Sequence, residues 1–211
     1  LISAFEQLTA GGYLSIQRST NLELPQLLAY AAGTFGAHPI AASTVAEVQH
    51  FIYERYRNLL ANDYDRNVVE AVLSLEPPLH QVLARIQACA RFALRPEAES
   101  LAAANKRIAN LLKKADGAIG QIVYGKLTEP AEQALAQTIT RLKPQAQAQF
   151  GQGDFAASLA TMAQAKDSVD TFFADIMIMA DDPAVRANRL ALLADLHGVM
   201  NQVADISRLA Q

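Results

Sequence analysis

The stretch that decides the fold is residues 167–207, DSVDTFFADIMIMADDPAVRANRLALLADLHGVMNQVADIS. Its first half spaces apolar residues three, four and seven apart, at Val169, Phe173, Ile176 and Met177. This spacing predicts a helix that runs to Met179. Asp182 precedes Pro183, and this pair is typical of an N-cap and first helical position, because proline has no amide hydrogen to leave unpaired. We therefore expect a second helix from Pro183, packed on the first as an antiparallel hairpin.

The second helix carries a charged residue within its apolar face. The face is made by Val185, Leu192, Leu193, Leu196, Val199, Met200, Val203 and Ile206. Arg189 falls between the directions of Leu196 and Met200, so its guanidinium has to reach solvent, pair with a carboxylate or face a bound partner. The favoured interpretation is an ion pair across the hairpin with Asp170 or Asp175.

The rest of the chain is also helical in pattern. Helices are expected over residues 1–10, 24–34, 44–61, 66–75, 79–94, 96–114 and 128–150, and from the cap Asp154 onward. Asp65 is expected to cap the helix that starts at 66, and Pro144 to bend the one from 128. No alternating apolar pattern lasts long enough to indicate a sheet. The sequence therefore predicts an all-α fold, with a boundary near Ser43.

Composition limits the classes of function. The 211 residues include 18 Lys or Arg and 21 Asp or Glu, for a formal net charge of −3, and 51% are hydrophobic. A single cysteine, Cys89, excludes an internal disulfide and favours a reducing cytoplasm, with the thiol expected to be a buried hydrophobe. No apolar run approaches the roughly 18 residues of a membrane span. The first residue is Leu1 rather than methionine, so we expect a fragment of a longer protein.

The middle of the chain is the basic part. Residues 44–127 hold eleven Lys or Arg against nine Asp or Glu, whereas residues 153–211 hold four against eight. The helix over 96–114 concentrates this charge, with no acid between Ser100 and Ala115. Its apolar arc is Leu101, Ala104, Ile108, Leu111 and Leu112, with Asn105 at the edge, and the opposite arc is Lys106, Arg107, Asn110, Lys113 and Lys114. This basic arc is either a solvated face paired with acids from elsewhere or a surface for an anionic partner.

Signals of catalysis and metal binding are absent. No GxSxG elbow, CxxC or HExxH spacing or P-loop occurs. Asp181 and Asp182 are interpreted as helix-cap residues rather than an acid/base pair. We therefore predict no catalytic residue and no metal ligand in this chain.

Aromatic side chains can stack on unpaired RNA bases, and each stacked base contributes roughly 1–3 kcal/mol of binding free energy. Phe172 and Phe173 are adjacent, so both cannot point into one core face. Phe173 is expected in the core and Phe172 against another helix rather than against RNA. The weaker candidates of the same kind are Tyr53, Tyr56, Tyr64 and Tyr124.

Several separated blocks resemble one protein family in the same order. They are NVVEAVLS (67–74), RFALRPEAESL (91–101), LAAANKRIANLLKK (101–114), LTEPAEQAL (127–135), FFADIMIMADDPAVRANRLALL (172–193) and VADIS (203–207). From roughly Val45 to the end, the chain resembles the close of the β subunit of the bacterial two-subunit glycyl-tRNA synthetases, which is a DALR-type helical anticodon-binding domain. The resemblance implies an all-α helical bundle of that type over residues 44–211. Residues 1–43 would be a short helical extension, the trailing segment of the preceding domain.

The resemblance also implies a function. The chain would bind the anticodon arm of tRNA(Gly), and the residues expected to contact it are Asn105, Lys106, Arg107, Asn110, Lys113, Lys114, Arg186 and Arg189. It would hold no cofactor and contact no membrane, while the α subunit of a cytoplasmic α2β2 enzyme would use ATP and Mg to attach glycine. The alternative is an all-α protein-interaction module that docks the α subunit or an acidic partner without binding RNA.

Overall fold

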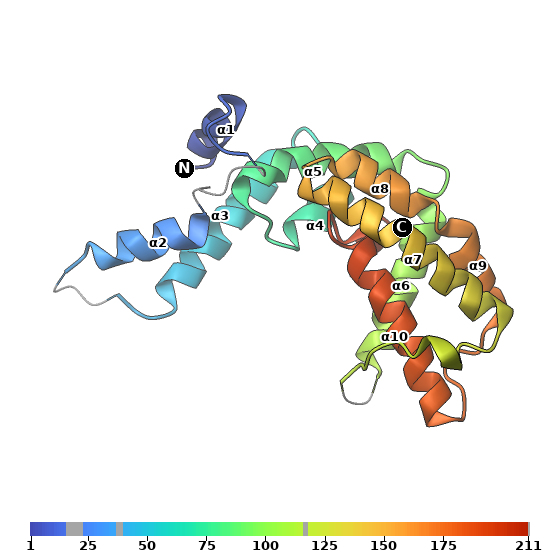
Figure 1. The fold of residues 1–211 in the computed structure, drawn as a ribbon. Helices are drawn as coiled ribbons and strands as arrows, with labels where there is room; N and C mark the ends of the chain where they lie inside the picture. Colours follow the sequence, from blue (N-terminus) through green and yellow to red (C-terminus); the bar gives the residue numbers. More distant parts are fainter. Residues whose placement is uncertain (16–22, 37–39, 116–117, 211) are drawn as a thin grey trace.

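The structure, a computed structural model, describes residues 1–15, 23–36, 40–115 and 118–210. Across these ranges every regular element is a helix, which confirms the all-α fold class. The helices are α1 (Ile2–Ala10), α2 (Leu24–Gly33), α3 (Thr44–Leu60), α4 (Arg66–Leu73), α5 (Leu79–Ala93), α6 (Ala98–Lys113), the 3₁₀ turn η1 (Tyr124–Lys126), α7 (Pro130–Gly151), α8 (Phe155–Ala163), α9 (Lys166–Asp175), α10 (Pro183–Met200) and the 3₁₀ turn η2 (Ile206–Leu209). Helices α4 to α10 form a bundle, and α1 to α3 lie toward one end of it (Figure 1).

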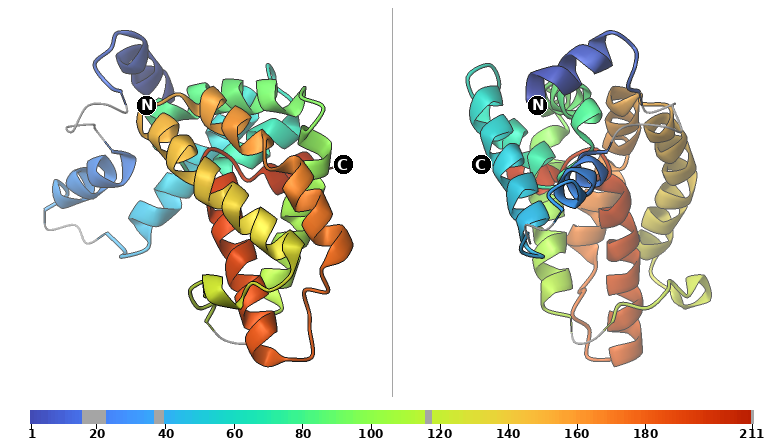
Figure 2. Two further views of the ribbon diagram at one scale, coloured as in Figure 1. Left: turned by 45° about the vertical axis from the view of Figure 1, so that its right-hand side comes forward. Right: turned by 90° about the vertical axis from the view of Figure 1, so that its left-hand side faces the viewer.

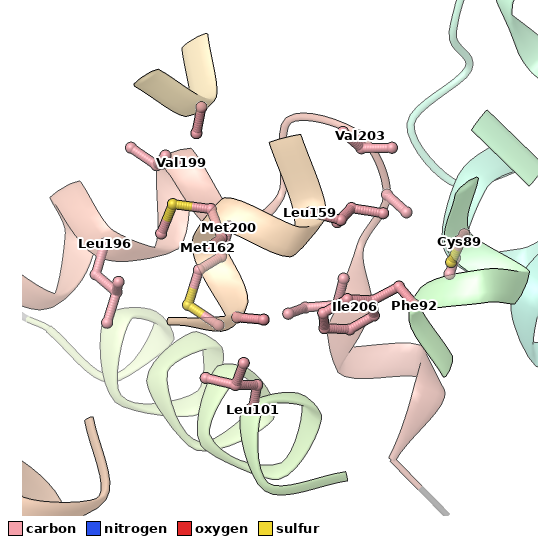
Figure 3. Packing of buried hydrophobic residues seen from close by; sticks show 14 of the residues in the cluster. Cys89, Phe92, Leu101, Leu159, Met162, Leu196, Val199, Met200, Val203 and Ile206 are labelled. Atoms are coloured by element: carbon pink, nitrogen blue, oxygen red, sulfur yellow. The ribbon is translucent and has the colours of Figure 1, made fainter. Parts of the chain in front are cut away.

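The bundle is organised around α6 and α10, which run side by side toward the end farthest from α1 to α3 (Figures 1 and 2). Helix α6 also packs on η2 and α9, while α7 packs on α8, α9 and α10. Apolar side chains from α5, α6, α8, α10 and the C-terminal segment meet in one core (Figure 3). The core residues labelled there include Phe92, Leu101, Leu159, Met162, Leu196 and Ile206. Because each large buried side chain contributes roughly 1.5–3 kcal/mol, this core fixes which face of α6 points outward.

Three aspartates cap helices where the sequence predicts them. The Asp65 carboxylate accepts from the Asn67 backbone N–H at 2.8 Å, and that of Asp154 from Ala157 at 3.0 Å. The Asp182 carboxylate accepts from the Ala184 N–H at 2.7 Å. Each cap pairs an amide that the first helical turn leaves without an intrahelical partner. The predicted starts of α4, α8 and α10 are therefore confirmed.

The predicted helix up to Met179 is wrong in two places. A turn at Gln164 and Ala165 separates α8 from α9, and α9 ends at Asp175. Ile176 then has an extended backbone, with φ −106° and ψ 122°. The two isoleucines of the following segment are buried, whereas Met177 and Met179 are 75% and 46% exposed. Apolar residues at 176–179 fit a helix and an extended strand-like segment equally well, and the structure takes the second, which alternates its side chains.

The predicted hairpin of two helices is also wrong. Helices α9 and α10 each pack mainly on α6 and α7 rather than on each other. Helix α10 ends at Met200, so Val203 and Ile206 lie beyond it, although both remain buried. The chain turns back after α10 and lays η2 along α6. The apolar positions predicted for the second helix are all buried except the half-buried Val185, and α10 meets its main partners on α6 and α7.

The prediction that Phe173 lies in the core is wrong, because Phe172 takes that position. Phe172 is 0% exposed, whereas Phe173 is only half-buried. The expectation that Phe172 packs inside the protein rather than awaiting RNA is confirmed. Which of two adjacent aromatic residues enters the core depends on how α9 is rotated against α6 and α7, and that contact is not encoded locally.

Arg85 of α5 is buried and fixes the C-terminal segment. Arg85 donates from Nη1 to the Gln202 carbonyl at 2.8 Å, and its guanidinium lies 4.9 Å and 5.1 Å from the ring centroids of Phe150 and Phe155. Burial lowers the pKa of Arg85 to about 10, so the guanidinium remains charged at neutral pH.

Cys89 is fully buried, which raises the pKa of its thiol to about 12. The thiol is therefore protonated at neutral pH, as expected of a buried hydrophobe.

Helix α3 buries a narrower face than its pattern suggests. Tyr53, Tyr56 and Leu60 are buried, while Phe51 and Leu59 are 64% and 48% exposed. Both tyrosine hydroxyls are satisfied, at 2.7 Å by the Pro77 carbonyl and at 2.9 Å by a Glu6 carboxylate. Tyr53 and Tyr56 are therefore not available to stack on bases. Helix α3 contacts both α2 and α4, and the domain boundary near Ser43 stays a prediction.

Among the helices of the described residues, none combines the length and the apolar character that crossing a bilayer requires.

Candidate nucleic-acid interface

The outer face of α6 carries a row of exposed polar side chains, which we call the α6 basic face. It consists of Lys106, Arg107, Asn110, Lys113 and Lys114. The opposite side of the helix is buried, with Leu101 and Ile108 at 1% and 0% exposure. The amphipathic pattern thus places every cation of the helix on one side, as the sequence predicts.

The four cations of this face form no ion pair with any carboxylate of the described residues. Like charges on neighbouring turns repel by a few tenths of a kcal/mol, and an anion placed across them relieves that repulsion. Lys113 and Lys114 lie at the C-terminal end of α6, where the helix dipole favours positive charge. The interpretation as a solvated face neutralised by acids from elsewhere is thus not supported within the described residues.

Arg107 is oriented by an aromatic ring. Its guanidinium lies 4.4 Å from the ring centroid of Phe173 on α9. At an exposed site such a cation–π contact contributes about 0.5–1 kcal/mol. No described residue accepts a hydrogen bond from the Arg107 guanidinium, so its N–H donors remain available to an anion.

Polar contacts behind the α6 basic face lock α6 to its neighbours. Ser100 donates to the Asp170 carboxylate of α9 at 2.7 Å, and Lys166 pairs with the same carboxylate at 2.7 Å. On the inner side, the Asn105 and Asn201 amides donate to each other at 2.8 and 3.1 Å. Asn105 is 0% exposed, so it does not lie on the surface where contact with RNA was expected. The sequence pattern puts Asn105 at the edge of the apolar arc of α6, and in the bundle that edge faces the interior.

We predict that Asn105→Ala destabilises the fold. The substitution removes both hydrogen bonds between Asn105 and Asn201, while Asn201 keeps those with the His197 carbonyl and the Ile206 N–H, and we expect a cost of about 1–3 kcal/mol of unfolding free energy. Urea denaturation followed by circular dichroism measures the loss. Asn110→Ala is the matched control, because Asn110 is exposed on the same helix and should shift stability by less than about 0.5 kcal/mol. Equal effects of the two substitutions would contradict the assignment of Asn105 as a structural residue.

Arg189 is the second candidate that the structure places inside. It is 9% exposed, and its Nε donates to the Glu132 carboxylate at 2.5 Å, while Nη1 donates to the Met177 carbonyl at 2.8 Å. The expected ion pair therefore exists, but its partner is Glu132 of α7 rather than Asp170 or Asp175. Glu132 also accepts from the backbone N–H groups of Thr128 and Glu129, which makes it part of the capping box of α7. The pair joins α7, α10 and the segment after α9.

Arg186 lies at the end of the α6 basic face. Its Nη1 donates to the Ala180 carbonyl at 2.6 Å, which fixes the turn between α9 and α10. Together with Lys114 it lines a hollow of about 190 Å³ at the tip of the bundle. The structure therefore brings together six of the eight residues expected to contact RNA: Lys106, Arg107, Asn110, Lys113, Lys114 and Arg186.

Several structural residues of this region were not among the eight expected to contact RNA. Asn188 is 6% exposed and holds the Val123 backbone by two hydrogen bonds, of 2.8 and 3.2 Å, so it fixes the connector after α6. Glu132 was detectable, because Glu three residues after a capping residue at a helix start is a capping-box signature. The position of Asn188 depends on contact between distant segments, and no local signal marks it. In the described part of the chain, no three His, Cys, Asp or Glu side chains lie close enough to hold a metal ion.

Comparison with known proteins gives a family match. The family model of the DALR anticodon binding domain matches residues 101–206, which is half of the chain. The glycine–tRNA ligase beta subunit of Ralstonia nicotianae is 45% identical over 197 residues, and that of Leptothrix cholodnii is 46% identical over 198. Each alignment covers 92% of this chain and 28% of the relative. The chain therefore spans little more than a quarter of these relatives, and the matched residues run from α6 to η2.

Proposed function

This chain belongs to the DALR anticodon-binding domain family, and from that premise we propose that its α6 basic face holds the anticodon arm of a tRNA. One observation supports the proposal above the others. Four cations and an amide lie exposed on one helix side, and no carboxylate of the described residues pairs with the cations. Phosphates of an RNA backbone supply the missing negative charge, and Lys and Arg are the residues that bind them.

The proposed tRNA is tRNA(Gly), because the relatives are named glycine–tRNA ligase beta subunits. In this proposal the parent protein is part of a cytoplasmic aminoacyl-tRNA synthetase. An α subunit attaches glycine with ATP and Mg in an α2β2 assembly, and residues 1–211 contribute no catalytic group and no cofactor site. Their role is positional: the grip on the anticodon arm admits only a matching tRNA to the chemistry at its acceptor end.

The arrangement of α6 supports a rigid grip. The helix is buried along its inner side and is tied to α9 and to the segment after α10 by hydrogen bonds. A binding face on such a helix loses little conformational entropy when it binds, because its backbone is already ordered. The acidic C-terminal half favours placing RNA phosphates on α6 rather than elsewhere.

Salt dependence tests the proposal. We expect the logarithm of the affinity of residues 1–211 for tRNA(Gly) to fall linearly with the logarithm of KCl concentration, with a slope of about −3.5 for four phosphate contacts. Fluorescence anisotropy with labelled tRNA measures it. No binding at low salt, or a slope near zero, would contradict the proposal. Retention of the α subunit by a chain that does not bind RNA would instead support the interaction-module alternative.

A further inference from the structure

The hollow at the tip of the bundle, which we call the tip cup, has the size and chemistry of a small binding site. It lies where the end of α6, residues 118–120, the turn before α10 and the start of α10 come together. The lining residues that carry chemistry are Lys114, Ile119, Met179, Pro183, Arg186 and Leu190. Its volume is about 190 Å³, and two of its lining residues are cations. The family match and the proposed contacts of the α6 basic face assign it no ligand.

The walls of the tip cup are apolar yet open to solvent. Ile119 is 38% exposed and Met179 is 46% exposed, while Leu190 is 6% exposed. Exposed apolar walls favour a flat apolar group, and a methionine thioether makes favourable contacts with aromatic rings. A nucleobase offers such a flat π surface, and stacking on it does not depend on the base's identity.

Arg186 adds directional hydrogen bonds to these walls. The bond to Ala180 uses Nη1, and no other described residue accepts from the guanidinium. Nε and Nη2 lie together on the opposite edge of the guanidinium, so one paired set of donors remains. Such a fork fits two adjacent acceptors, as on the O6 and N7 edge of guanine or the O2 and N3 edge of cytosine.

The backbone beside Ile119 is also open. Among the described residues, no hydrogen bond is formed by the backbone N–H and C=O groups of residues 118–120. Asn188 of α10 forms two hydrogen bonds with the Val123 backbone, so the segment that contains Ile119 is held against α10 at its C-terminal end. Exposed backbone groups that have no hydrogen-bond partner among the described residues are suited to hydrogen-bonding the edge of an unpaired base.

The tip cup continues the α6 basic face. Lys114 lines both the cup and a shallow hollow of about 380 Å³ that includes Lys106, Arg107 and Asn110. A strand whose phosphates follow these cations therefore reaches the cup at Lys114. This continuity distinguishes the cup from the larger hollow beside Asp63, Asp65 and Glu99, where three acids would repel an RNA.

We propose that the tip cup receives one unpaired base of the bound RNA loop, with Met179 and Ile119 against its face and Arg186 on an edge with two adjacent acceptors. The inference rests on the proposed function and deepens it, because it assigns the reading of a base to a site separate from the backbone contacts. Lys114 contacts the phosphate that precedes or follows the inserted base. Arg186 thus becomes a specificity residue, while Lys106 and Arg107 bind any strand.

The test uses the anticodon-arm hairpin of tRNA(Gly) and a series in which each loop nucleotide in turn lacks its base. Wild-type residues 1–211 should bind the intact hairpin about 10-fold more tightly than the member lacking the inserted base, since a stacked base is worth roughly that factor or more. Arg186→Lys and Met179→Ala should each reduce this ratio to less than about 3-fold, because neither variant completes the cup. Arg91→Lys, an exposed arginine on α5, is the control and should leave the ratio unchanged.

The outcomes separate the two proposals. Failure of the wild-type chain to bind any hairpin would overturn the proposed function and the cup with it. Salt-dependent binding with no base-dependent position, or a ratio that Arg186→Lys and Met179→Ala leave intact, would overturn the cup alone. Circular dichroism of both variants shows whether the helices are retained. Because Met179 is exposed and Arg186 is half-buried, neither substitution is expected to unfold the chain.

Discussion

Reversing the charge of Lys106 and Arg107 to glutamate together should lower the affinity for tRNA(Gly) by about 60-fold at 0.1 M salt. Each phosphate contact releases roughly 0.9 of a counterion, so losing one contact lowers the affinity about 8-fold at that salt concentration, and two losses multiply. The slope of log affinity against log salt should become shallower by about 2 units. Anisotropy titrations at several KCl concentrations measure both quantities.

A matched control separates the α6 basic face from net charge. Arg55→Glu with Arg66→Glu also reverses two exposed arginines, one on α3 and one on α4, which pair with no carboxylate of the described residues. Because each reversal removes two units, either double variant moves the formal net charge from −3 to −7. The control should lose much less affinity than the α6 variant. Equal losses would mean that the tRNA responds to overall charge and that α6 is not the binding surface.

The α6 variant is expected to remain folded, so the loss can be assigned to binding. Lys106 is exposed, and Arg107 contributes only its contact with Phe173, worth about 0.5–1 kcal/mol. Removing repulsion between neighbouring cations offsets part of that loss. Thermal melting should therefore shift by only a few degrees, since about 1 kcal/mol corresponds to roughly 2–4 °C in a chain of this size.

The predictions from sequence were most accurate where the cause is local. Cap residues such as Asp65, Asp154 and Asp182 act on amides two or three residues away, so the helix starts could be predicted. The outward direction of Lys106 and Arg107 likewise follows from the period of a single helix. The α6 basic face could therefore be predicted nearly whole.

The errors concern features that depend on distant contacts. The choice of Phe172 over Phe173 for the core depends on the rotation of α9 against α6 and α7. Asn105 faces Asn201, 96 residues away in sequence, and Arg189 faces Glu132, 57 residues away. The tip cup combines segments from α6 to α10, and nothing in any one of them marks it. The sequence pattern predicts that Arg189 is buried and needs a partner, but which carboxylate it pairs with depends on how the helices pack.

Glu132→Ala is expected to be the most destabilising single substitution among those considered, with a loss of about 3–5 kcal/mol of unfolding free energy. Glu132 is 2% exposed and Arg189 is 9% exposed, so removing the carboxylate leaves a buried guanidinium without its counter-charge. The substitution also removes the acceptor for two backbone N–H groups at the start of α7. Urea denaturation measures the loss. Glu129→Ala, which removes only the other half of the capping box, should cost about 1 kcal/mol.

A double-mutant cycle tests whether the loss comes from the pair itself. Replacing both partners, as Glu132→Met with Arg189→Met, removes both buried charges and leaves apolar side chains of similar length. Because removing either partner alone leaves a buried charge unpaired, the loss in the double variant should be smaller than the sum of the two single losses, Glu132→Met and Arg189→Met, by at least about 1–2 kcal/mol. Additive losses would show that the two residues act independently. If the coupling is found, Arg189 holds α10 to α7, and any loss of tRNA binding measured for an Arg189 variant reports a displaced helix rather than a lost RNA contact.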